Sequence, residues 1–565
     1  MGDLAPRSEA HGGAQDPATT DTSDGEPQGL DASLESGAGD SSWRSRRSAV
    51  PMARQTQPQP GPAVSYSDEQ LQVITSNEPR IVCRAFAGGG KTTMAIGFAA
   101  ARPREPWLYL CLNKANAEEA KKRFGPNVTA ATTHSVAWRA LGMRKDRIAE
   151  RWNPMVLMDQ LRLRTPREAG VAMRILNAYF CSGERDISDL HAEEARAALD
   201  LSPGEVMNGV AHAALAWARM NDSSSGFRMP HDAYLKMFAL SAPKLDYAGI
   251  IFDEFQDANP VTLQVVLGQR GLKLLGIGDP YQNIYGFRGS VNAIEQLEQT
   301  ASAYNLTRTW RFGPRIAGVA NHLLHELRGE KQSIVGMGKD QDWGIPRQET
   351  ILTRTNIKLF QIAAPMRGEG VHWVGGCEKY RLGLIEDAYR LYSRQYSAIE
   401  DAILRRRFGS WADYVDYAEA ANDGEARILV KVIEEFTHGI PDLVHEIRAN
   451  EVKEPGDAAM VLSTAHSSKG LEFDRVRIGD DFEVLDKAEA ALAAGTPEDL
   501  PTQDVNLLYV AITRARSAVC LNDETNRWLQ DLPLHRTARE AAAVRRHEEL
   551  NRIRAQIDSI RPSRA

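Results

Sequence analysis

The sequence predicts an α/β protein whose parallel strands end at chemically active residues. The stretch IVCRAFAGGGKTTMAIGFA at 81–99 reads as a buried strand, a glycine-rich turn and the first turns of a helix. A second apolar run, at 249–252, ends in the carboxylates of Asp253 and Glu254. Because parallel α/β sheets place their ligands at strand ends, we expect both segments to face one site.

The first 64 residues differ in composition from the rest of the chain. They are dense in Gly, Ser, Pro, Asp and Gln, so they cannot bury enough apolar surface to offset the entropy cost of folding. We expect residues 1–64 to be a disordered tail, and the sequence leaves open whether Met52 is an alternative start. This tail carries nine acidic and five basic residues, so about −3 of the net charge of −7 belongs to the body. That balance neither supports nor excludes a nucleic-acid partner.

The glycine-rich turn predicts a phosphate site. Residues Gly88–Gly90 lack the Cβ atoms that would keep backbone N–H groups away from a polyphosphate, and the following helix adds its positive N-terminal end. We expect Lys91 to reach the terminal phosphates and Thr92 to hold Mg²⁺. The strict motif begins with Gly where this chain has Ala85, and the alternative is a glycine-rich turn that binds nothing.

The acidic pair suits a magnesium nucleotide. Asp253 would contact Mg²⁺ and Glu254 would orient the attacking water, whereas the alternative is an acidic loop of a common kind. In the next segment, LKLLGIGDPYQNIYGFRGS at 272–290, Gln282 could hydrogen-bond both a γ-phosphate and a neighbouring chain. Phe287 stands beside an arginine, a combination that can stack on a base.

The cysteines and the apolar runs indicate the cellular compartment of the protein. The five cysteines are scattered and form no C-x-x-C pair, which indicates neither a disulfide framework nor a zinc or iron–sulfur site. No signal peptide is evident, and no run approaches the roughly 20 apolar residues that a membrane span requires. We expect a soluble intracellular protein without a membrane partner, cytoplasmic in a bacterial or phage setting or nuclear in a eukaryotic one.

DEFQD and GDPYQNIYGFRG together resemble motifs II and III of the superfamily 1 DNA helicases of the UvrD/Rep/PcrA type. Other segments resemble the Q motif and motifs Ia, Ib, IV, IVa, V and VI, and they occur along the chain in family order: SYSDEQLQVI, LYLCLNKANAEEA, TTHSVAW, NLTRTWRF, ILTRTN, LSTAHSSKGLEFDRV and NLLYVAITRAR. The resemblance spans roughly residues 65–525. The segments HDAYLKMF and VGGCEKYRLGLIEDAYRL are more similar to the F-box DNA helicases than to other members of the family. No F-box is evident, so the resemblance does not imply a ubiquitin-ligase role.

The resemblance implies two RecA-like P-loop domains with helical insertions. Domain 1A would cover residues 65–135 and 240–290, and domain 2A would cover 291–374 and 455–530. A helical insertion 1B would occupy 136–239, a shortened insertion 2B would occupy 375–454, and 531–565 would form a charged helix or tail.

In this family ATP and Mg²⁺ lie between the two domains, and each domain contributes to the site. The implied catalytic residues, with two arginine fingers among them, are Lys91, Asp253, Glu254, Gln282, Arg311 and Arg514. The implied nucleotide contacts are Gln70, Ala87, Gly88, Gly89, Gly90, Lys91, Thr92, Thr93, Trp310 and Glu472, with Thr92 and Asp253 on the metal. Trp310 would stack on adenine and Glu472 would bond the ribose, unless they are a core Trp and a surface Glu. Thr93 stands where many relatives carry Arg, which leaves strict ATP selectivity open.

The resemblance also implies a track for single-stranded DNA. Its implied residues are Asn113, His134, Phe287, Arg354, Thr464 and His466. Stacking on Phe287 would be worth about 1–3 kcal/mol per base and would tolerate any sequence, while the alternative is a core aromatic. Leu110–Leu112 replace the usual start of motif Ia, so one base platform is expected to be missing.

The implied function is that of an ATP-dependent 3′–5′ single-stranded DNA translocase or helicase in replication, recombination or repair. It would act on forked or 3′-tailed DNA and displace proteins, such as a recombination protein that coats single strands. The alternative is a nucleotide-switched DNA-binding or scaffold protein, which would not need Glu254, Arg311 and Arg514 together. A helicase–nuclease fusion is disfavoured, because only about 40 residues follow the last motif. The sequence leaves the oligomeric state open.

Overall fold

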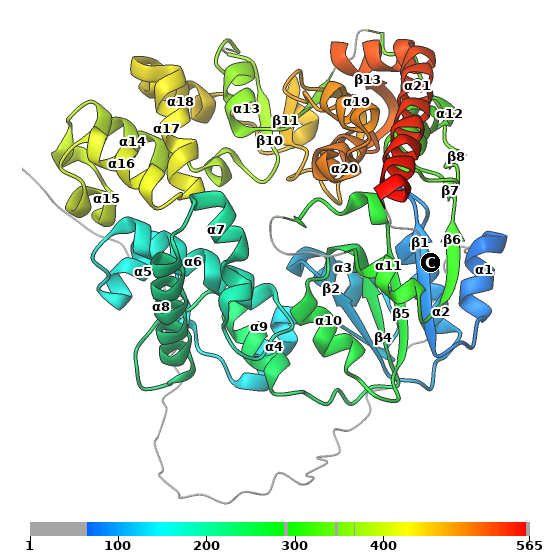
Figure 1. Ribbon diagram of the computed structural model, residues 1–565, viewed down its shortest axis with the longest axis horizontal. Helices are drawn as coiled ribbons and strands as arrows, with labels where there is room; N and C mark the ends of the chain where they lie inside the picture. Colours follow the sequence, from blue (N-terminus) through cyan, green and yellow to red (C-terminus); the bar gives the residue numbers. More distant parts are fainter. Residues whose placement is uncertain (1–64, 287–291, 345–347, 367, 561–565) are drawn as a thin grey trace, which may run out of the picture. The chain divides into compact units, whose positions relative to one another are not determined.

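Two parallel sheets organise the part of the chain that can be described (Figure 1). The computed structural model describes residues 65–286, 292–344, 348–366 and 368–560, without the side chains of 549 and 554–560. The predicted tail at 1–64 and Phe287 lie outside these ranges. Helices flank both sheets, so the predicted α/β class is confirmed. Among the described residues we find no helix whose length and apolar run would carry it across a bilayer.

The first sheet has six parallel strands in the order β3-β2-β4-β5-β1-β6. The strands are β1 (Arg80–Ala85), β2 (Trp107–Cys111), β3 (Val128–Thr132), β4 (Gly249–Asp253), β5 (Lys273–Gly278) and β6 (Ser302–Leu306). Three of them, β2, β4 and β5, are buried along almost their whole length, as a parallel sheet covered on both faces requires. The glycine-rich turn and the acidic pair therefore follow neighbouring central strands.

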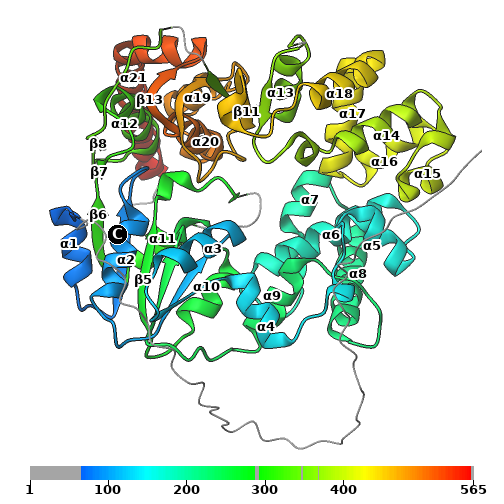
Figure 2. The same ribbon diagram turned by 180° about the vertical axis from the view of Figure 1, so that it is seen from behind.

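Helices cover the two faces of this sheet separately (Figure 2). On one face lie α1 (Asp68–Thr75), α2 (Lys91–Ala100) and α3 (Lys114–Arg123), and on the other α10 (Pro260–Leu267) and α11 (Ala293–Glu298). The alternation along β1 explains the division. Ile81 and Cys83 pack with the first group, whereas Val82 packs with the second.

A helical insertion lies between β3 and β4 and has its own apolar core. Its helices are α4 (Thr133–Leu141), α5 (Pro154–Leu161), α6 (Pro166–Cys181), α7 (Glu193–Leu199), α8 (Pro203–Asn221) and α9 (His231–Leu240). Three of them begin with a polar cap followed by proline: Asn153, Thr165 and Ser202 each accept a hydrogen bond from the first turn. These starts are encoded locally.

The second sheet has five parallel strands in the order β10-β11-β9-β12-β13. They are β9 (Glu349–Thr353), β10 (Val371–Trp373), β11 (Met460–Thr464), β12 (Phe473–Ile478) and β13 (Ala515–Cys520). Around it lie α12 (Pro314–Arg328), α13 (Asn356–Ala363), α19 (Leu485–Ala494) and α20 (Thr502–Ile512). A short ribbon joins β7 (Arg308–Thr309) to β8 (Val335–Gly336). Between β10 and β11 the chain forms α14 (Leu382–Tyr392), α15 (Ala402–Arg407), α16 (Trp411–Ala420), α17 (Gly424–Phe436) and α18 (Ile440–Ala449).

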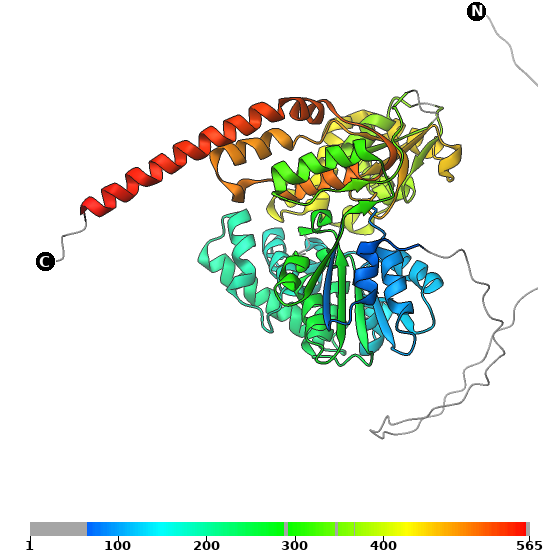
Figure 3. The ribbon, with the colours of Figure 1, turned by 90° about the vertical axis from the view of Figure 1, so that its right-hand side faces the viewer.

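The structure corrects two predicted boundaries. The first sheet does not end before 291, because β6 pairs in parallel with β1 and α11 packs on this sheet. The predicted boundary at 530/531 falls inside one continuous helix, α21 (Asp523–Ile560), the long red helix of Figure 3. Trp528, near the start of α21, is buried in the apolar cluster that also contains residues of α12, α19 and α20, whereas Leu534 and Val544 are exposed.

We predict that Gly249→Ala lowers the free energy of unfolding by about 1–3 kcal/mol, because overpacking strains a filled core. A Cβ at this position of β4 would lie 2.8 Å from the Lys273 carbonyl oxygen and would collide with the Trp107 ring. Gly204→Ala on α8 is the matched control, because an added Cβ there meets no atom within 4 Å. Urea unfolding measures both, and equal effects would contradict the packing argument.

Candidate functional site

The loop between β1 and α2 needs glycine for two reasons. Gly88 and Gly90 adopt φ angles of +74° and +75°, which other residues rarely adopt. A Cβ on Gly88 would lie 2.6 Å from the Arg311 Cβ atom and would collide with the Thr309 hydroxyl. The loop therefore meets a segment that leads into the second sheet at near-contact distance, and Thr92 and Thr93 follow it, half-buried, on the first turn of α2.

Gln70, which the resemblance to the Q motif implies as a nucleotide contact, lies at the same loop. It is the third residue of α1 and forms a capping box with Ser67, so its position follows from local sequence. Its Nε2 donates to the Gly90 carbonyl oxygen at 3.4 Å. The buried amide is thus fixed beside the last glycine of the turn.

The carboxylates after β4 have different partners. Glu254, at φ +56°, accepts from Lys91 Nζ at 3.1 and 3.2 Å and from Gln256 Nε2 at 2.6 Å. Asp253 accepts a hydrogen bond of 2.5 Å from the Tyr109 hydroxyl on the neighbouring strand β2. Sequence reasoning missed Tyr109, because its pairing with β4 is a property of the sheet.

Burial and charge divide the titration of this pair. Burial, then the charge of Glu254, raises the pKa of Asp253. Burial also opposes ionisation of Glu254, but Lys91 and then Lys469 outweigh it, so its pKa falls to about 2. Burial disfavours charged Lys91, yet Glu254 and Asp253 raise its pKa above the usual value. The site thus keeps one firmly ionised carboxylate beside a charged lysine.

Two arginines from the second sheet's side reach the same region. Arg514, which is 1% exposed, donates from Nη2 to Gln282 Oε1 at 3.2 Å. Burial, then the neighbouring charge of Arg311, lowers the pKa of Arg514 to about 9, so the guanidinium is cationic at neutral pH. Arg311 pairs with Glu472 at 2.8 Å and donates to the Thr513 carbonyl oxygen at 2.9 Å. Both predicted fingers therefore lie near the glycine-rich loop and the acidic pair.

The remaining predicted nucleotide residues lie close by but differ in exposure. Trp310 is 50% exposed, so it is not a core tryptophan and its ring is accessible for stacking. Glu472 is engaged by Arg311 and would have to share its carboxylate with a ribose. Ala87 is buried, and its backbone N–H donates to the Tyr509 hydroxyl at 3.3 Å.

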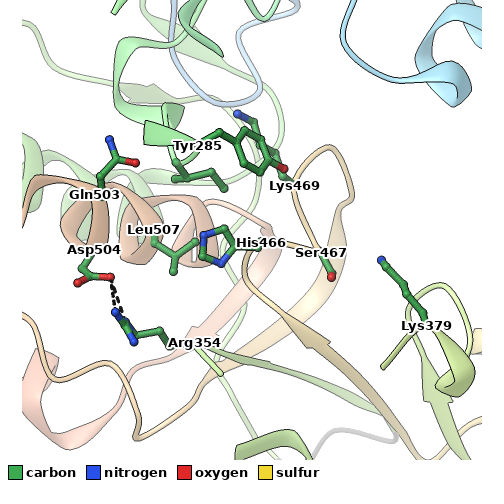
Figure 4. Close-up of a pocket in the computed structure, with 10 residues that line it drawn as sticks. Tyr285, Arg354, Lys379, His466, Ser467, Lys469, Gln503, Asp504 and Leu507 are labelled. Atoms are coloured by element: carbon green, nitrogen blue, oxygen red, sulfur yellow. Dashed lines mark hydrogen bonds and ion pairs between the residues drawn. The ribbon is translucent and has the colours of Figure 1, made fainter. Parts of the chain in front are cut away.

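A separate pocket of about 570 Å³ holds two of the predicted DNA residues, Arg354 and His466 (Figure 4). Its lining residues are Ile284, Tyr285, Arg354, Lys379, His466, Ser467, Lys469, Gln503, Asp504 and Leu507. The Tyr285 and His466 rings are 6.4 Å apart, and Lys469 Nζ is 5.0 Å from the Tyr285 ring centre. Arg354 pairs with Asp504 at 2.9 Å. Aromatic rings and cations thus share one open site.

The structure does not bring the other described DNA candidates into this pocket. Asn113 caps α3 through its Oδ1 atom, which accepts from the Asn116 N–H at 2.7 Å. His134 on α4 contacts Asp232 at 3.1 Å. Thr464 is buried, and its hydroxyl accepts from the Ser467 N–H at 3.2 Å. Phe287 lies outside the described residues.

Lys469 connects the pocket to the DEFQD segment at 253–257, a role that sequence reasoning missed. Its ammonium pairs with Asp257 and donates to the Gln282 carbonyl oxygen at 2.6 Å. Burial raises the pKa of Asp257 to about 6, although Lys469 opposes that shift. The signal was present as a lysine within HSSKGLEF, but its partner lies 212 residues away.

Comparison with known proteins assigns the family of one segment. Residues 237–302, which contain β4, the acidic pair and Gln282, match the family model of the UvrD/REP helicase N-terminal domain. This segment belongs to that family. The resemblance predicted from the motifs is therefore confirmed, and the two parallel sheets fit two RecA-like domains.

The chain is also similar to curated proteins over longer stretches. F-box DNA helicase 1 of Gallus gallus is 30% identical over 81% of this chain and 49% of that protein. F-box DNA helicase protein 1 of Schizosaccharomyces pombe is 28% identical over 81% of this chain and 58% of that protein. ATP-dependent DNA helicase UvrD2 of Mycobacterium bovis is 23% identical over 49% of this chain and 47% of that protein. The chain thus spans about half the length of these curated relatives.

The solved structure of PRRSV helicase covers 82% of this chain and 55% of its own, at 12% identity and a TM-score of 0.28. That similarity is too low to carry an argument.

We predict that Arg514→Ala lowers DNA-stimulated ATP hydrolysis by about 10³-fold or more, because an arginine finger stabilises charge in the transition state. Binding of a fluorescent ATP analogue should remain measurable. Arg516→Ala is the control, because Arg516 is an exposed residue of β13 two positions away. Normal turnover in Arg514→Ala would reject the assignment.

Proposed function

We propose that the chain is an ATP-dependent DNA helicase that moves 3′ to 5′ along single-stranded DNA. The observation that carries this proposal is the contact between Arg514, from the second sheet's side, and Gln282, from the first. A γ-phosphate between Lys91, Gln282 and Arg514 would be contacted by residues from both sheets' sides. Hydrolysis of the nucleotide would remove these contacts and so change how the two sheets pack against each other. The named relatives, which are called DNA helicases, support the same reading.

In this proposal the first sheet with its flanking helices is domain 1A, and the second is domain 2A. The helices between β3 and β4 form insertion 1B, and those between β10 and β11 form insertion 2B. Lys91, now paired with Glu254, would turn to the phosphates and leave Glu254 to orient the attacking water.

The residues present suit a magnesium ion. Asp253 and Thr92 offer the hard oxygen ligands that Mg²⁺ takes, and a cation would offset the burial that raises the pKa of Asp253. When bound, the ion would neutralise charge on the β- and γ-phosphates. ATP and Mg²⁺ are accordingly the proposed ligands of the site formed by the glycine-rich loop and the acidic pair.

The pocket around Tyr285 and His466 is the proposed DNA-binding site. Base stacking on such rings tolerates any sequence, which a moving protein needs. Lys469 touches both this pocket and the carbonyl of Gln282, so a strand in the pocket could alter the nucleotide site through one side chain. Forked or 3′-tailed DNA would be the substrate, and a recombination protein coating the single strand would be the displaced partner.

We predict that ATP hydrolysis rises when single-stranded DNA is added and that Lys91→Ala abolishes the rise. The lysine is expected to bind the terminal phosphates, so its loss removes transition-state charge stabilisation. Lys431→Ala, on the exposed face of α17, should behave as wild type. Hydrolysis that is indifferent to DNA would favour a nucleotide-switched binding protein instead. Substrates with only a 3′ or only a 5′ tail test the polarity.

We predict that Tyr285→Ala weakens binding of a fluorescent oligothymidylate by roughly 5- to 150-fold, the worth of one stacked base. Fluorescence anisotropy at fixed salt measures the affinity. Tyr396→Ala is the matched control, because this tyrosine is exposed on the helical insertion and does not line the pocket. Unchanged affinity in Tyr285→Ala would move the DNA site elsewhere.

A further inference from the structure

A buried hydroxyl from α20 lies between the glycine-rich loop and the end of β5. Tyr509 has no exposed surface, and its hydroxyl donates to Asp279 Oδ2 at 2.9 Å while it accepts from the Ala87 N–H at 3.3 Å. Tyrosine carries one hydroxyl proton, so this proton is committed to Asp279. The surrounding cluster is apolar and includes Phe86 and Tyr281, so the hydroxyl has a specific polar role within a core.

Asp279 passes this constraint to Gln282. The buried carboxylate also accepts from Gln282 Nε2 at 2.8 Å and from the Tyr281 backbone N–H at 3.1 Å. A glutamine side chain donates only from its nitrogen and accepts only at its oxygen. Because Asp279 holds the nitrogen end, the oxygen end faces Arg514, at 3.2 Å.

We infer that Tyr509 is a positioning residue for hydrolysis: its hydroxyl holds Asp279 so that Gln282 presents its oxygen to Arg514. The inference rests on the proposed function and adds a residue to that site. Tyr509 lies in the last turn of α20, and Arg514 lies in the link between α20 and β13. One short stretch of the chain therefore holds both ends of this series of hydrogen bonds. Without the hydroxyl the amide could rotate and turn its NH₂ group toward the guanidinium, where two donors would face each other.

A purely structural role for the tyrosine predicts something different. Elsewhere in the chain Tyr417 makes a similar buried pair: its hydroxyl donates to Asp423 Oδ2 at 2.7 Å in the helical insertion between β10 and β11. Tyr417→Phe therefore removes an equivalent hydroxyl–carboxylate bond far along the chain from the nucleotide site. It is the matched control for the loss of stability.

The test compares Tyr509→Phe with Tyr417→Phe in steady-state ATP hydrolysis with saturating single-stranded DNA. We expect Tyr509→Phe to lower kcat by about 10- to 100-fold, the effect of losing a hydrogen bond to a charged group. KM for ATP and the affinity for a fluorescent ATP analogue should stay within about threefold, as expected for an interaction that matters in the transition state. Tyr417→Phe should shift the melting temperature similarly and leave kcat unchanged.

Two further variants address coupling and folding. If Tyr509 acts through Gln282, Tyr509→Phe should lower kcat no further in a Gln282→Ala background. Asp279→Asn removes the carboxylate while keeping the side-chain shape, and it should lower kcat as Tyr509→Phe does, even if Tyr509→Phe folds poorly.

The outcomes separate this inference from the proposed function. Wild-type protein that does not hydrolyse ATP would overturn both. DNA-stimulated wild-type protein with a normal kcat in Tyr509→Phe, or additive losses in the double variant, would overturn the positioning role alone.

Discussion

The rest of the structure depends on buried polar contacts at the junction, the region where residues of the first sheet's side meet residues of the second sheet's side. Lys469 meets Asp257, and Arg514 meets Gln282, in each case across that junction. Removing one partner of the Lys469–Asp257 ion pair would cost about 3–5 kcal/mol, because the other charge is left uncompensated. Gln282 is neutral and supplies a hydrogen-bond acceptor for the buried Arg514. The two sheets, each with its flanking helices, therefore have to meet in one arrangement. That arrangement assembles the candidate nucleotide site.

Close packing makes the glycine-rich loop part of this junction. Phe86 and Ala87 belong to the same apolar cluster as residues of α12 and α20, such as Ile316 and Leu508. Because a packed core cannot deform continuously, a change of ligand at the loop would shift whole elements. This packing would connect the proposed phosphate binding to a relative movement of the two sheets.

The two helical insertions form a second connection. A Cβ on Gly170 of α6 would lie 2.8 Å from the backbone carbonyl carbon of Ala421, so these helices approach backbone to backbone. Arg151 pairs with Asp401 at 2.5 Å, and Asp159 receives Arg406 and Arg407 from α15. These ion pairs are partly exposed, so salt screens them more than the buried pairs of the junction.

Local sequence determined the parts of this protein whose geometry depends on neighbours in the chain. The turn at 86–90, the strand that ends in Asp253 and the capping box of Gln70 follow from residue type and spacing, because glycine freedom, strand burial and helix capping act over a few residues. The family motifs added the order of the segments. They predicted that Arg311 and Arg514 lie near the glycine-rich turn, and in the structure Arg311 packs against Gly88 while Arg514 contacts Gln282.

Only the tertiary structure decided which side chains are partners. The pairing of Lys469 with Asp257, of Arg311 with Glu472 and of Tyr509 with Asp279 joins residues more than 160 positions apart. No local spacing encodes such pairs, because they depend on how two sheets dock and on which end of a buried amide faces which neighbour. For the same reason the sequence placed the end of the first domain too early. The pairing of β6 with β1 is visible only once the sheet is assembled.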